Sequence, residues 1–135
     1  MALKERPTSA RPLWERAMSY YRQAARVLPA SGNPYNQMAV MAYHTNEELR
    51  AVYFYFRSLA VAMPFSTARE NLLLLFEKNR SRYGFIAAAH ASAALHGGAD
   101  ASARAAAGAA SDVSIRFVRL HGLLFDRINT EQLPE

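Results

Sequence analysis

One pattern of small and aromatic residues occurs twice along this chain and constrains its fold more than any other feature of the sequence. The first copy consists of Ala17, Tyr21 and Ala24. The second copy, thirty-four positions later, consists of Ala51, Tyr55 and Ser58. Residues three or four apart share one face of a helix, where small side chains let a second helix approach and an aromatic ring fills the space beside them. The repeat therefore predicts helices that stack on one another in pairs.

Prolines and a second set of residues complete the pattern. Pro29 follows the first copy and Pro64 follows the second, one residue late, and a proline at such a place ends a helix. Between the copies, the positions of a partner helix are filled by Tyr35, Met38, Ala39 and Ala42. This spacing is typical of the tetratricopeptide motif. We therefore predict an all-α, tetratricopeptide-like antiparallel helical repeat, an alpha-alpha superhelix of about five helices.

The period of the apolar residues gives the bounds of these helices. The predicted helices span 12–28, 34–44, 46–63, a range from 67 to beyond 83, and 112–130. The apolar stripe of the first helix consists of Trp14, Ala17, Tyr21, Ala24 and Leu28. No stretch alternates with the period of a β-strand.

Three helix starts have recognisable signals. Asn33 stands before Pro34, where its side chain is expected to accept a bond from a helix-start amide. Thr45 with Glu48 has the spacing of a capping box, and Thr67 repeats this device with Glu70.

Changes in composition divide the chain into four regions. We expect a flexible N-terminus over 1–11, tetratricopeptide-like repeats over 12–86, an Ala/Gly-rich linker over 87–111, and over 112–130 the C-terminal helix of an adjoining helical hairpin region. The linker has few large apolar groups to bury, so frayed helix and disorder are expected there. The first repeat lacks its first helix, which indicates an excerpt or a shortened relative of a longer array, unless Leu3 and Leu13 cover that face.

Composition excludes several classes of protein. The chain has no cysteine, which rules out disulfides and thiolate chemistry. Its longest strongly apolar run, 72–76, is too short to span a bilayer, so we expect a soluble protein. The formal net charge of +5 favours an acidic partner such as RNA, DNA or a phosphorylated peptide, although the basic residues are interspersed with acidic ones, as expected of solvated helix faces.

No constellation of an enzyme or of a metal site is present in the sequence. The four histidines have no helical metal spacing: His44, His90, His96 and His121. Gly97 and Gly98 lie in low-complexity sequence with no strand before them, which excludes a phosphate-binding loop. We predict no catalytic residue, no metal and no cofactor.

Six short stretches of the sequence form a distinctive series: 20–29 (YYRQAARVLP), 32–40 (GNPYNQMAV), 51–60 (AVYFYFRSLA), 64–65 (PF), 67–72 (TARENL) and 117–125 (FVRLHGLLF). In this order they resemble the Est-one/SMG family, and most closely its SMG-seven-like branch. They cover most of 15–80 and then 113–130, but not the alanine-rich linker. The family's phosphate-binding basic side chains lie upstream of the first stretch, and none of them is carried over to this chain.

This resemblance implies an adaptor in nonsense-mediated mRNA decay. Family members bind the phosphorylated up-frameshift helicase through a 14-3-3-like domain and organise decay factors, which implies protein partners and a cytoplasmic location with shuttling to the nucleus. Another branch serves telomerase, so the alternative is a telomerase-associated module that binds RNA or telomeric DNA.

A tetratricopeptide array binds its ligand in a groove lined by first-helix residues. By this register the groove residues are Asn33, Asn36, Val40, Tyr43 and His44, and Arg57 on the next helix is a candidate anion contact. Asn36 is suited to hold an extended peptide through two backbone bonds, although Asn36 and Gln37 are also suited to tie one helix to the next. For Arg57 the favoured alternative is a solvated surface residue. The aromatic run 53–56 suggests base stacking, with core packing as the favoured alternative.

Overall fold

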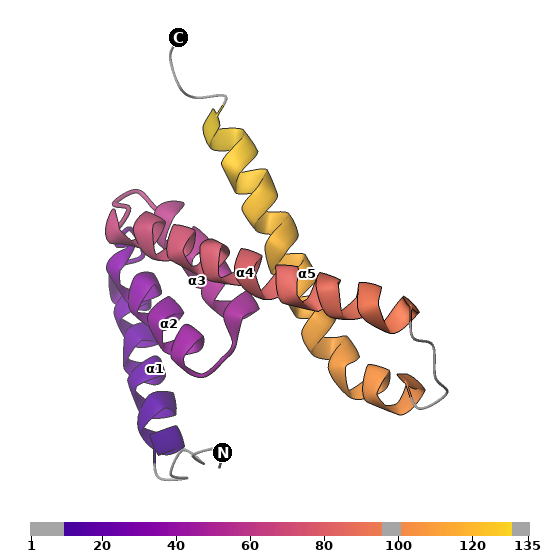
Figure 1. The fold of residues 1–135 in the computed structure, drawn as a ribbon. Coiled ribbons are helices and arrows are strands. Elements are labelled where there is room, and N and C mark those ends of the chain that lie inside the picture. The colour runs from indigo at the N-terminus through magenta and orange to yellow at the C-terminus, as the bar shows by residue number, and fades with distance from the viewer. Residues whose placement is uncertain (1–9, 96–100, 131–135) are drawn as a thin grey trace. The chain divides into compact units, whose positions relative to one another are not determined.

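The computed structural model describes residues 10–95 and 101–130, with side chains over 13–92 and 112–127. The predictions made for residues 1–9 and for His96 concern parts of the chain outside these ranges. Five helices follow one another: α1 (Ala10–Val27), α2 (Asn33–His44), α3 (Glu48–Leu59), α4 (Thr67–Leu95) and α5 (Ala101–Thr130), as Figure 1 shows. The predicted all-helical, tetratricopeptide-like class is confirmed. The described chain forms two compact units that divide between Arg69 and Glu70.

In the first unit, α2 packs against both α1 and α3. Its contacts rest on small side chains, because Ala39 of α2 and Ala51 of α3 are both fully buried. Tyr55 is 4% exposed and Ser58 is 0% exposed, so the second copy of the repeated pattern lies in the helix contact as predicted. Because no side chain larger than alanine or serine stands at three of these positions, the two backbones can approach closely.

The buried stripe of α1 differs from the prediction. Met18 and Ala25 are buried, whereas Ala24 is exposed and Leu28 is 51% exposed. The cause is a rotation of the helix: α2 covers the side that carries Met18 and Ala25, and no described helix of this unit covers the side that carries Ala24. The other members of the predicted stripe, Trp14, Ala17 and Tyr21, are half-buried, so the prediction fails only at its C-terminal end.

Two of the predicted helix caps are wrong. Asn33 is the first residue of α2, and α2 has no side-chain cap; the Asn33 Oδ1 atom instead accepts a bond of 3.4 Å from Gln37 Nε2. The Thr45 hydroxyl donates backwards to the carbonyl oxygens of Met41 and Ala42, at 3.2 and 3.0 Å. It therefore closes α2 instead of opening α3, whose N-cap is Glu47 without a side-chain bond.

The loop after α3 returns to the start of α2. α3 ends at Leu59, four residues before its predicted end, and Met63 pairs with the loop after α1 in an isolated parallel bridge. Gly32 N donates to Met63 O at 2.9 Å, and Met63 N donates to Ala30 O at 2.8 Å. These bonds replace the last helical turn and fix the spacing between the start of α2 and the end of α3.

The second unit contains most of α4 together with α5, and both helices extend into the predicted linker. α4 continues to Leu95 and α5 begins at Ala101, because alanine favours helix even without a large apolar face. The rings of Phe76 and Phe125 lie 5.8 Å apart, and Asn79 Nδ2 donates to Ile115 O at 3.1 Å. No helix within the described ranges is long and apolar enough to cross a membrane.

A candidate peptide-binding surface on α2 and α3

α2 presents one row of side chains to solvent. The row consists of Asn33, Gln37, Val40 and His44, which we call the α2 stripe. Asn33 and His44 are exposed, and Gln37 and Val40 are half-buried. Steps of four, three and four residues keep the row on one helix face, and eleven residues of rise give it a length of roughly 16 Å. Its amide end and its aromatic end therefore offer two chemically different contacts to one ligand.

The structure separates the predicted groove residues into two groups. Asn33, Val40 and His44 lie together on the α2 stripe, and Tyr43 is half-buried beside it, with its ring 6.1 Å from that of His44. Asn36 is only 3% exposed, so its amide lies in the helix packing and is not offered to a ligand on this surface. Gln37 takes its place on the outward face.

Gln37 was not among the predicted site residues. The signal for it was present in the sequence, since it stands four residues after Asn33 and seven before His44. The choice between the neighbouring amides Asn36 and Gln37 depends on a rotation of 100° per residue, and only the packing of α2 on two sides decides it.

The ring of His44 joins the stripe to α1. Its centroid lies 5.9 Å from that of Trp14 in a tilted arrangement, a distance within the range of aromatic pairs. This end of the stripe is therefore an aromatic platform built from two helices, while the Asn33 end is polar.

Arg57 is held on the ring of a tyrosine. Its Nη2 atom donates to the Tyr35 hydroxyl at 3.0 Å, and its guanidinium carbon lies 5.0 Å from the centroid of the same ring. The hydrogen bond to Tyr35, and then the nearby phenolic groups, raise the pKa of Arg57 above its usual value. Arg57 thus stays charged and carries a preorientated guanidinium at the surface.

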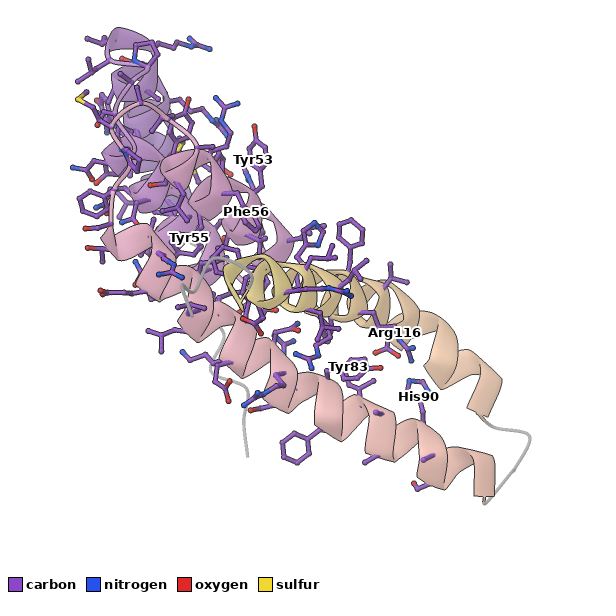
Figure 2. The ribbon with its side chains drawn as sticks, turned by 90° about the horizontal axis from the view of Figure 1, so that it is seen from above. Tyr53, Tyr55, Phe56, Tyr83, His90 and Arg116 are labelled. Carbon is purple, nitrogen blue, oxygen red and sulfur yellow. The ribbon has the colours of Figure 1, made fainter. Side chains whose placement is uncertain are left out.

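The aromatic run after Ala51 is divided between core and surface. Phe54 and Tyr55 are buried and Phe56 is half-buried, as the core-packing alternative predicted, whereas Tyr53 is 55% exposed. Figure 2 labels Tyr53, Tyr55 and Phe56. Burial raises the pKa of Tyr55 to about 12.

The outward face of α3 alternates basic and aromatic groups. Tyr53 stands between Arg50 and Arg57 on this face. The Arg50 guanidinium lies 5.7 Å from the Phe54 ring and also pairs with Glu47 at 2.8 Å. This row is short, and half of its charge is neutralised.

The excess of positive over negative charge lies in the first half of the chain. Residues 1–69 contain nine Lys and Arg against four Asp and Glu, whereas residues 70–135 contain seven of each. An acidic partner is therefore attracted to the unit that carries the α2 stripe.

One pair of titratable groups links the two helices of the second unit. His90, labelled in Figure 2, contacts Asp112 at 2.8 Å and joins α4 to α5. Among the described residues, no group of three or more His, Asp or Glu side chains is placed to hold a metal ion.

Known proteins similar to this chain share one domain family. The Est1 DNA/RNA binding domain matches residues 17–135. The nonsense-mediated mRNA decay factor SMG7 of Arabidopsis thaliana is 44% identical in an alignment 136 residues long that covers 85% of this chain and 13% of that protein. An SMG7-like factor of the same plant is 57% identical over 70 residues, covering 52% of this chain and 8% of the relative.

A telomerase-binding protein is also similar. EST1A of Danio rerio is 45% identical over 67 residues, which is 50% of this chain and 4% of that protein. The chain thus spans only a small part of the length of these relatives. The resemblance inferred from the six sequence stretches is confirmed.

Proposed function

Because this chain belongs to the family of the Est1 DNA/RNA binding domain, we propose that it is a protein-binding adaptor module of nonsense-mediated mRNA decay. It acts by holding partners together, not by catalysis. The partners are the phosphorylated up-frameshift helicase and decay factors, and the proposed location is the cytoplasm with shuttling to the nucleus. The α2 stripe is the observation that best supports this proposal.

The stripe has the dimensions and chemistry of a peptide site. Its length of roughly 16 Å matches about five residues of an extended chain. The side-chain amides of Asn33 and Gln37 can donate to and accept from a peptide backbone, and their mutual bond of 3.4 Å is weak enough to be exchanged. Val40 and His44 supply an apolar surface for the next side chain of the ligand.

Binding of a phosphorylated fragment of the helicase to the full chain tests this proposal. A double variant in which Asp replaces both Gln37 and Val40 is expected to bind at least tenfold more weakly, because each change removes a contact at the centre of the stripe. Gln23→Asp is the matched control, since Gln23 is exposed on α1 away from the stripe. Equal affinities of the stripe variant and the control would contradict the proposal.

A telomerase-associated nucleic-acid-binding module is the second candidate. The row of Arg50, Tyr53 and Arg57 favours it, because an exposed aromatic between two arginines can stack on a base while phosphates lie beside it. Affinity for single-stranded RNA or DNA that falls steeply with salt supports this candidate, whereas salt-tolerant binding of a defined peptide supports the adaptor.

A further inference from the structure

A hollow of about 230 Å³ opens where α1, α2 and α3 meet in the first unit. Its apolar floor consists of Trp14, Met18 and Met41. Its lining contains none of the four residues of the α2 stripe, although it shares Trp14 with the aromatic platform at the His44 end of that stripe.

The floor is suited to one large apolar side chain. Met18 is 8% exposed and Met41 is 7% exposed, so their side chains form the bottom of the hollow and not a projecting surface. The volume is below that of typical cofactor and drug sites, which makes a single side chain the occupant of matching size. Methionine is flexible and polarisable and adapts to apolar groups of different shape.

The rim carries one basic and one acidic side chain that form no ion pair within the part of the chain whose side chains are described. Glu47 and Arg50 pair at 2.8 Å and neutralise one another. Glu15 and Arg22 are exposed on α1, two turns or roughly 10 Å apart, and neither has an ion-pair partner among the side chains that the structure describes. A ligand that enters the hollow therefore meets an unpaired guanidinium on one side and an unpaired carboxylate on the other.

We propose that this hollow binds a Leu-, Met- or Phe-sized side chain from an acidic segment of a protein partner, with a carboxylate of that segment on Arg22. The excess of nine basic over four acidic residues in 1–69 favours the acidic segment through long-range attraction. This inference rests on the proposed adaptor function and names the chemistry of one partner.

The only tryptophan of the chain lies in the floor, which provides a local reporter. The probe is an acetylated, amidated heptapeptide with Leu at its centre and Asp or Glu at the other six positions. Titration into the full chain is expected to change the emission of Trp14 in a saturable manner. The same peptide with Ala at its centre is expected to bind roughly tenfold more weakly, because the buried apolar group is lost.

Charge variants have expected effects of opposite sign. Arg22→Gln weakens binding of the Leu peptide by roughly two- to fivefold, and Glu15→Gln strengthens it by a similar factor, since the first removes an attraction and the second a repulsion. Arg26→Gln is the matched control, because Arg26 is exposed one turn beyond Arg22 and does not line the hollow. Far-ultraviolet circular dichroism shows that each variant is folded.

Several results would overturn the assignment. These are equal binding of the Ala and Leu peptides, equal effects of Arg22→Gln and Arg26→Gln, and an emission change caused by a single-stranded oligonucleotide but not by the Leu peptide. If the heptapeptide fails while the helicase fragment still binds through the α2 stripe, only this hollow is refuted. If stripe variants have no effect while the heptapeptide binds, the proposed function fails and the hollow remains.

Discussion

Replacing Gly32 with Ala is expected to destabilise the first unit strongly. A Cβ atom there would stand 2.3 Å from the Ser58 carbonyl oxygen and 2.7 Å from the Phe65 nitrogen, both of which are backbone atoms. Relief to an ordinary contact requires the start of α2 and the end of α3 to separate by about 1 Å. That movement disrupts the 2.7 Å bond from Ser58 Oγ to Gly32 O and the 2.9 Å bond from Gly32 N to Met63 O.

The size of the effect follows from these losses. Two hydrogen bonds contribute about 1 kcal/mol each, and overpacking costs about 1–3 kcal/mol, so the free energy of unfolding falls by roughly 3–5 kcal/mol. The melting temperature then falls on the order of 15 °C. Thermal unfolding followed by circular dichroism measures this.

Gly84→Ala is the control, since its Cβ meets nothing within 4 Å and the change raises helix propensity by about 1 kcal/mol. If the free energy of unfolding of Gly32→Ala lies within about 1 kcal/mol of that of the wild type, the start of α2 and the end of α3 do not lie as close together as described.

Three further predictions concern the core. At an open helix position, replacing Gly with Ala raises the free energy of unfolding by about 1 kcal/mol. Gly122→Ala is expected to lack this stabilisation, because its Cβ atom would lie 3.2 Å from the Phe76 ring. A melting temperature that rises as much as that of Gly84→Ala would contradict this. Asn79→Asp is expected to lower the free energy of unfolding, measured by denaturant titration, by at least 2 kcal/mol, since it buries a carboxylate against Ile115 O. Asn79→Leu is expected to change this free energy by no more than about 1 kcal/mol, because it also removes the unpaired Oδ1 atom. The pKa of Tyr55 is about 12 in the fold and 10.0 when unperturbed, so Tyr55 ionises first in the unfolded state. Roughly 2–3 kcal/mol of the free energy of unfolding that is present below pH 10 is therefore lost as the pH rises to about 12. Tyr55→Phe should reduce this loss, and a free energy of unfolding that falls with pH as steeply in the variant as in the wild type would refute the prediction.

The helix contact of the second repeat was predictable because it depends on residue size and spacing alone. Ala51, Tyr55 and Ser58 are buried as their spacing requires. The first repeat was not fully predictable, because the same spacing around Ala24 marks a face that has no covering helix among the described residues of its unit.

Most other differences between prediction and structure arise where a local sequence signal is compatible with two structures. The Thr45 hydroxyl is equally suited to open the following helix or to close the preceding one, and in the structure it donates to the carbonyls of Met41 and Ala42. The alanine-rich stretch has high helix propensity but little apolar surface, and its propensity prevails over most of 87–111.

The hollow beside Trp14 was beyond sequence reasoning for a different reason. Its lining comes from three helices, and only their packing brings Met18 and Met41 together. No spacing within one helix indicates such a site.

The side-chain amide resonances of Asn33 and Gln37 provide the most direct test of the account. We predict that a phosphorylated helicase fragment shifts both resonances in a saturable manner in the full chain, at an affinity that depends weakly on salt. Binding of the fragment without any shift at these two amides would contradict the account. So would shifts confined to the Arg50, Tyr53 and Arg57 row and produced only by RNA.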